Sequence, residues 1–141
     1  MLIFDTDAMT VWLNPRDSDH APLRWRYRGV EAPQRATTIV SLQEQMKGWL
    51  AKIHRARTAV EVVRAYANLL DAFDGYKSFE VLPFDAPAQE KYEDFRRKQL
   101  RVSVLDLRIA CIALVHGGTV LTRNVRDFRR VPGLLVEDWS K

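Results

Sequence analysis

The stretch LDLRIACIALVHGGTVLTRNVRDFRRVPGLLVEDW, residues 105–139, is the part of this sequence that most constrains the fold. Residues 104–116 are apolar almost all round, which predicts a helix buried between other elements rather than one lying on the surface. Gly117 and Gly118 follow directly and are expected to end this helix. The stretch therefore begins with a buried helix.

The rest of that stretch predicts two short strands joined by turns. Residues 119–123 have the composition of a strand, and a turn of helix is expected to begin at Asn124. The pair Pro132 and Gly133 predicts a turn, and a last strand is expected over residues 134–136. A buried helix followed by short apolar strands is typical of an α/β protein.

The earlier part of the chain alternates in the same way. Apolar or β-branched runs predict strands over residues 1–5, 36–40 and 79–84, and helical spacing predicts helices over residues 42–54, 59–73 and 85–100. Strands that alternate with helices imply a mainly parallel sheet with helices on both faces. Ligands of such sheets bind at the carboxyl ends of the strands.

Composition limits the class of protein. A chain of 141 residues with 47% hydrophobic and 28% charged residues predicts a single folded domain over residues 1–141. Cys111 is the only cysteine, which excludes an intrachain disulfide and a cysteine-based zinc site. The longest apolar runs are too short to cross a bilayer, and the N-terminus lacks the pattern of a signal peptide. We therefore expect a cytoplasmic protein without membrane contact.

Acidic residues follow the predicted strands. Asp5 and Asp7 end the first strand, Glu44 lies near the start of the helix after the second, Asp106 begins the buried helix, and Asp127 follows the fourth strand. Two carboxylates about 4 Å apart repel by roughly 4 kcal/mol at an effective dielectric of about 20, so such a group needs a cation. All-oxygen sites suit Mg²⁺ or Mn²⁺, which in a nuclease activate a water and shield the phosphate.

Helix capping offers a structural explanation for three of these acids. The pairs spaced as a cap and its partner three residues later are Ser41 and Glu44, Ser103 and Asp106, and Asn124 and Asp127. Thr58 and Glu61 have the same spacing far from any strand end. Capping explains each acid singly, but it does not explain why they share one edge of the sheet.

Three strings of the sequence resemble the PIN-domain ribonucleases and, within them, the VapC-type toxins of bacterial toxin–antitoxin pairs. These strings are LIFDTDAM at residues 2–9, TIVSLQEQMKGWL at residues 38–50, and the closing stretch. The resemblance implies a three-layer α/β/α sandwich, an endoribonuclease that cuts single-stranded or loop RNA with Mg²⁺ or Mn²⁺, a homodimer, and a cognate antitoxin protein.

By this resemblance, Asp5, Glu44 and Asp106 match the family's main metal-binding acids. Asp127 matches the fourth acid, with Asn124 near enough to share that role. Asp7 is either an extra ligand or a turn residue. Thr6 and Thr122 could donate hydrogen bonds to ligand carboxylates, although capping is the more ordinary use of Thr6.

Basic residues gather in groups, which suits a polyanionic partner but also fits solvated helix faces. The groups are Arg24, Arg26 and Arg28; Arg55 and Arg57; Arg96, Arg97 and Lys98; and Arg126, Arg129 and Arg130. Trp25 and Tyr27 alternate with the first group. That segment is either a surface for single-stranded nucleic acid or a helix that binds the antitoxin with its aromatics buried.

Two other functions remain open from the sequence. The Asp-x-Asp pair after the first strand also begins the haloacid-dehalogenase-like phosphatases, in which Asp5 would be the nucleophile and Asp7 the acid. Alternatively, the domain is a binding module without activity, and its acids only cap helices.

Overall fold

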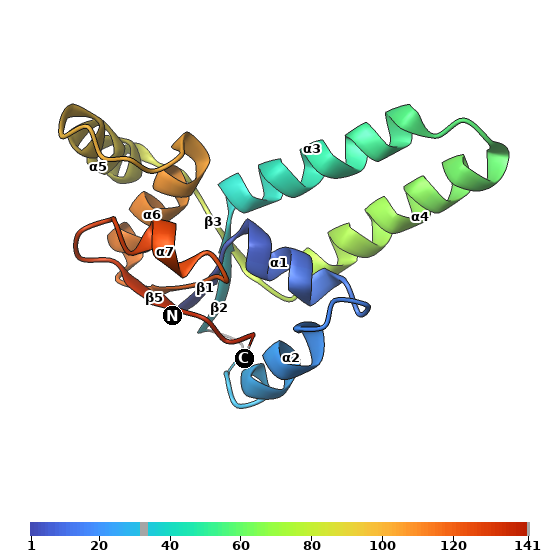
Figure 1. Ribbon diagram of the computed structural model, residues 1–141, viewed down its shortest axis with the longest axis horizontal. Helices are drawn as coiled ribbons and strands as arrows, with labels where there is room; N and C mark the ends of the chain where they lie inside the picture. Colours follow the sequence, from blue (N-terminus) through green and yellow to red (C-terminus); the bar gives the residue numbers. More distant parts are fainter. Residues whose placement is uncertain (32–33, 141) are drawn as a thin grey trace.

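The computed structural model describes residues 1–31 and 34–140, which form a central parallel sheet with helices around it (Figure 1). The strands are β1 (Leu2–Phe4), β2 (Arg35–Thr38), β3 (Glu80–Leu82), β4 (Thr119–Leu121) and β5 (Leu135–Glu137). The helices are α1 (Thr6–Leu13), α2 (His20–Tyr27), α3 (Ile39–Arg55), α4 (Ala59–Tyr76), α5 (Ala86–Arg97), α6 (Val104–His116) and α7 (Val125–Phe128).

The five strands are all parallel and lie in the order β3-β2-β1-β4-β5. From β1 the chain builds the sheet outward through β2 and β3, and it then returns to place β4 on the other side of β1. This reversal puts a topological switch point at the carboxyl end of β1, where sheets of this kind bind ligands.

Alternating side chains of the strands face two separate cores. Ile3 and Val120 pack with the apolar α6, whereas the neighbouring residues Phe4 and Leu121 pack on the opposite face with α1 and α2. Phe4 lies at the centre of an aromatic cluster and is 5.0 Å from the ring centroid of Phe79. The predicted three-layer α/β/α architecture is therefore confirmed.

The helices α3 and α4 run side by side as a long hairpin that projects from the sheet (Figure 1). Both are longer than the helices predicted from the apolar spacing over residues 42–54 and 59–73. Within the described residues, no helix is both long and apolar enough to span a bilayer.

The start of α3 differs from the sequence prediction. The strand expected over residues 36–40 ends at Thr38, whose hydroxyl accepts a hydrogen bond from the backbone N–H of Ser41 at 3.0 Å. Thr38 is thus the N-cap, and the predicted cap at Ser41 is wrong. The β-branched residues Ile39 and Val40 favour a strand locally, but the Thr38 cap begins the helix before them.

Candidate functional site

Asp5 lies at the switch point and is almost fully buried, with 3% of its surface exposed. It is the N-cap of α1, because its Oδ1 accepts a hydrogen bond from the backbone N–H of Ala8 at 2.7 Å. Burial raises the pKa of this carboxyl to about 7; hydrogen bonds from Ala8 and Thr122 oppose the increase, and the charges of Asp7 and Asp106 add to it. The fold thus holds Asp5 where its negative charge is poorly solvated.

Asp106 and Asp127 continue the acidic group from Asp5. Burial raises the pKa of Asp106, a hydrogen bond with Ser103 opposes this shift, and the charge of Asp127 adds to it. Because Asp106 in turn raises the pKa of Asp5, these three acids form a continuous series of mutually repelling charges. Asn124 donates from Nδ2 to Asp127 Oδ2 at 3.0 Å and so lies within the same group.

Capping explains part of the placement of Asp106 but little of that of Asp127. The backbone N–H of Asp106 donates to the Ser103 hydroxyl at 3.3 Å, so the predicted cap at Ser103 is confirmed. Asn124 precedes α7, yet its side chain makes no capping hydrogen bond. The capping hydrogen bond comes from the backbone of Asp106, and its carboxyl also has a hydrogen bond with Ser103, which opposes the increase in its pKa.

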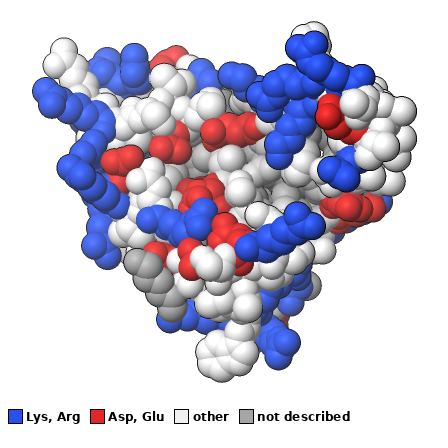
Figure 2. Space-filling view, turned by 45° about the vertical axis from the view of Figure 1, so that its right-hand side comes forward, with Lys and Arg blue, Asp and Glu red and all other residues white. Residues whose placement is uncertain are grey.

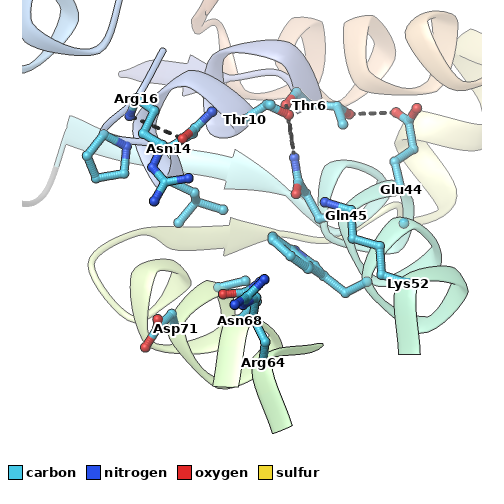
Figure 3. Close-up of a pocket in the computed structure, with 15 residues that line it drawn as sticks. Thr6, Thr10, Asn14, Arg16, Glu44, Gln45, Lys52, Arg64, Asn68 and Asp71 are labelled. Atoms are coloured by element: carbon cyan, nitrogen blue, oxygen red, sulfur yellow. Dashed lines mark hydrogen bonds between the residues drawn. The ribbon is translucent and has the colours of Figure 1, made fainter. Parts of the chain in front are cut away.

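Glu44 is connected to α1 through Thr6, the residue after Asp5, and the charges that act on Asp5 are those of Asp7 and Asp106. The Thr6 hydroxyl donates to Glu44 Oε1 at 2.6 Å, which joins α3 to the first turn of α1 (Figure 3). Thr6 therefore binds a carboxylate, as one of its two predicted roles required, while Asp5 rather than Thr6 caps the helix. Glu44 also faces Tyr76, whose pKa is raised mainly by burial and further by this charge.

Asp7 is occupied by an ion pair that the sequence did not indicate. Arg123 donates to Asp7 Oδ1 from its NH2 nitrogen at 2.7 Å, and the same guanidinium reaches Asp17 at 3.3 Å and Asp19 at 3.1 Å. The hydrogen bond to Asp7 is the largest cause of the raised pKa of Arg123. No local pattern of the sequence indicates a role for Arg123 or predicts its contacts with Asp7 or Asp17.

Across residues 1–31 and 34–140, no three side chains of Asp, Glu, His or Cys converge closely enough to hold a metal ion. The candidate ligands at this edge are carboxylate oxygens, from the buried Asp5 and the partly buried Asp106. Mg²⁺ and Mn²⁺ prefer carboxylate oxygens as ligands. The charges of these carboxylates interact, but the side chains do not converge on one point.

Figure 2 shows acidic side chains gathered in the middle of a hollowed face, with basic side chains on both sides of them. A polyanion laid across such a face would meet cations at its flanks and acids at its centre. This distribution fits a substrate whose backbone is held at the sides while a central group is exposed to the acids.

The segment from Arg24 to Arg28 fits neither prediction fully. Tyr27 is buried in the aromatic cluster, whereas Trp25 is 71% exposed. The Arg24 guanidinium lies over the Trp12 ring at 3.4 Å from its centroid, so this arginine packs within the protein. Half of the aromatic pair therefore serves the core, and half remains on the surface.

Sequence comparison relates this α/β protein to the PIN domain and to proteins that are named ribonucleases. Residues 2–134 match the PIN domain. Ribonuclease VapC2 of Rickettsia felis is 33% identical over 66 residues, covering 44% of this chain and 49% of that protein. The tRNA(fMet)-specific endonuclease VapC of Salmonella typhimurium is 37% identical over 75 residues, covering 50% and 57%. The matches thus span about half the length of these curated relatives.

Solved structures agree over nearly the whole chain. VapBC-1 from nontypeable Haemophilus influenzae has a TM-score of 0.73 and 20% identity, covering 99% of this chain and 98% of the other. DNA-bound VapBC from Salmonella typhimurium has a TM-score of 0.75 and 25% identity, covering 98% and 97%. The fold and the acidic edge define an α/β protein built around an oxygen-rich site. The chain belongs to the PIN domain family.

Proposed function

We propose that this protein is a metal-dependent endoribonuclease and the toxin of a toxin–antitoxin pair, cutting single-stranded or loop RNA with Mg²⁺ or Mn²⁺. The observation that carries the proposal is the series of interacting charges Asp5, Asp106 and Asp127 at the switch point of the sheet. The similarity to VapC ribonucleases supports the same reaction class.

In this proposal, Asp5, Asp106 and Asp127 supply the carboxylate oxygens, and Glu44 completes the set from its position beside Thr6. A bound divalent ion would lower the pKa of the attacking water and shield the charge that builds on the phosphate. Neighbouring carboxylates repel one another, so a bound cation would stabilise the group. Hydrogen bonds from Thr6 to Glu44 and from Thr122 to Asp5 would orient these two carboxylates.

The decisive experiment is Asp106→Asn, assayed on a fluorescent single-stranded RNA with Mg²⁺ or Mn²⁺. We expect cleavage to fall at least 100-fold, because a ligand charge is lost. The fold should remain, because the Ser103 cap binds the backbone of residue 106. Its stability should change by about 1 kcal/mol or less. EDTA should abolish cleavage by the unmodified protein.

Glu61→Gln is the matched control. Glu61 occupies the corresponding position after the Thr58 cap, where its backbone N–H donates to the Thr58 hydroxyl at 3.2 Å. Because it lies at the start of α4, away from the acidic edge, this variant should cleave RNA normally. Equal cleavage by Asp106→Asn and the unmodified protein would refute the proposal.

The two other functions lead to different outcomes of the same assay. A binding module would hold the RNA without cutting it. A haloacid-dehalogenase-like phosphatase would hydrolyse small phosphate monoesters and would need Asp7 as its acid. The bidentate contact of Asp7 with Arg123 and the match to the PIN domain argue against that reaction.

The proposal includes a homodimer and an antitoxin partner. The solved relatives named VapBC support a protein partner. The outer face of α4 supports it as well, because it carries an apolar stripe of side chains that are each more than half exposed. The α4 stripe consists of Val60, Val63, Tyr66, Leu70 and Phe73. Exposed apolar surface of this extent is typical of protein interfaces.

A further inference from the structure

A cavity of about 1090 Å³ lies between α1 and the α3–α4 hairpin, and Glu44, one of the candidate acids, lies in its lining (Figure 3). Thr6, the residue after Asp5, also lines the cavity and is hydrogen-bonded to Glu44. A smaller hollow adjoins it farther along the hairpin and shares Lys52, Arg64 and Asn68 with it. A chain bound at the acids could therefore continue into this cavity.

Cations from three parts of the chain line the cavity. Arg16 follows α1, Lys52 lies on α3 and Arg64 lies on α4. Glu44 and Asp71 are the acidic residues of the lining, and Glu44 belongs to the acidic edge. Positive charge leading away from a group of carboxylates fits phosphates of a strand whose cleaved bond lies at those carboxylates.

The remaining lining suits a nucleobase. Trp49 contributes an aromatic ring whose Nε1 is buried without a hydrogen-bond partner in the described residues. The Lys52 ammonium lies 4.3 Å from the centroid of this ring. Asn68 offers an amide that can both donate and accept, as base edges require. Stacking rings combined with cations are typical of sites for single-stranded nucleic acid.

The two faces of α4 separate this cavity from the protein interface proposed above. Residues two positions apart point about 200° from each other around a helix. Arg64 and Asn68 line the cavity, whereas Tyr66 and Leu70 belong to the exposed α4 stripe. The polar, cationic face thus favours a nucleotide, and the apolar face favours a protein.

We propose that this cavity binds a nucleotide of the RNA next to the cleaved phosphodiester. Trp49 stacks on its base, Asn68 contacts the base edge, and Arg64 and Lys52 hold its phosphates. This inference rests on the proposed nuclease function and adds to it the residues that select the sequence flanking the cut.

The test measures binding of a labelled ten-nucleotide single-stranded RNA to the full chain in EDTA, by fluorescence anisotropy. Trp49→Ala should weaken binding about 5- to 150-fold, the range expected for loss of base stacking. Arg64→Ala should weaken it several-fold and lower the slope of log affinity against log salt by about 0.7, as expected for one phosphate contact to a single strand. Asn68→Ala should reduce the preference among oligonucleotides that differ at one base.

Two further variants make the result specific. Lys77→Ala removes an exposed lysine just after α4, outside the cavity lining and the basic groups named above, and should leave affinity within twofold of the unmodified protein. Trp49→Phe keeps an aromatic ring and should retain most of the affinity while reducing the quenching of tryptophan fluorescence by RNA. Thermal melting of each variant checks that it is folded.

Unchanged RNA affinity in Trp49→Ala, Arg64→Ala and Asn68→Ala would overturn the inference. The inference would also fail if these variants kept their RNA affinity but no longer bound a co-expressed protein partner, because the cavity would then bind protein. If the unmodified protein cleaves the RNA and these variants keep its KM, the nuclease stands without this subsite. If RNA binding depends on the cavity but no cleavage occurs, the subsite stands and the nuclease fails.

Discussion

The carboxylate of Asp5 both caps a helix and is buried. It caps α1 through Ala8, and its burial raises its pKa to about 7. A carboxyl that binds its proton more tightly in the folded than in the unfolded chain lowers stability as pH rises. The loss begins above the usual value of 3.8 and is complete above about 7.

Asp5→Asn should therefore stabilise the protein in EDTA at pH 8. We expect an increase in unfolding free energy on the order of 4 kcal/mol, because the pKa rises by about three units and one unit corresponds to about 1.4 kcal/mol. Asparagine caps helices as well as aspartate does, so the cap is kept. The increase should shrink as pH falls from 8 to 4.5, measured by urea unfolding. A variant less stable than the unmodified protein at pH 8 would contradict this account.

At the scale of secondary-structure elements, the ion pairs of Arg123 connect the loop after β4 to α1 and to the loop that follows α1. Its side chain is 35% exposed, so solvent screening weakens each of its ion pairs. The three carboxylates nevertheless share one guanidinium, which restricts all the segments that carry them. We infer that Arg123 positions the loop containing Asn124 at the acidic edge.

Arg123→Gln should accordingly lower stability by about 1 kcal/mol and increase amide hydrogen exchange over residues 14–19. In a double-mutant cycle with Asp7→Asn, we expect a coupling energy of about 0.5–1.5 kcal/mol. Arg97→Gln is the control, since the exposed pair of Arg97 with Asp94 at 3.6 Å should contribute little. Equal exchange in the two arginine variants would show that the network does not restrain the loop.

Two helical glycines of the hairpin should respond differently to alanine. A Cβ at Gly48 would meet no atom within 4 Å, so Gly48→Ala should stabilise α3 by about 0.5–1 kcal/mol through its higher helix propensity. A Cβ at Gly75 would collide with the side chain of Leu13, so Gly75→Ala should lose that gain or destabilise. Thermal unfolding of both variants checks the contrast, and similar shifts would contradict it.

At the scale of the whole molecule, metal binding should increase the free energy of unfolding. A metal that binds only the folded state at about 100 times its dissociation constant stabilises by roughly 2.7 kcal/mol. We expect Mn²⁺ to raise the melting temperature of the unmodified protein and to have little effect on Asp106→Asn. An unchanged melting temperature in both proteins would argue against the metal site.

The exposed α4 stripe is a candidate interface for the proposed homodimer. If the α4 stripe forms the homodimer interface, Leu70→Glu should place a charge in it and convert the dimer to a monomer, measured by light scattering. RNA binding per chain should persist, because residue 70 lies on the face of α4 opposite the cavity. A dimer that survives the substitution would place its interface elsewhere.

The sequence by itself determined the local elements and the candidate acids. The helix over residues 104–116, its end at Gly117 and the Ser103 cap were all predicted, because periodicity, left-handed glycine and capping depend on near neighbours. The alternation of strands and helices also predicted the parallel sheet. Asp5, Glu44 and Asp127 were proposed as candidates because each comes soon after a predicted strand, and Asp106 because it begins the buried helix.

Only the tertiary structure decided how those parts meet. The bond from Thr6 to Glu44 and the contacts of Arg123 with Asp7 and Asp17 join segments whose relation local patterns do not encode. The cavity beside the acids likewise needs α1 and the hairpin together. Contacts between residues distant in the sequence depend on how whole elements pack, and packing energy is shared among many side chains.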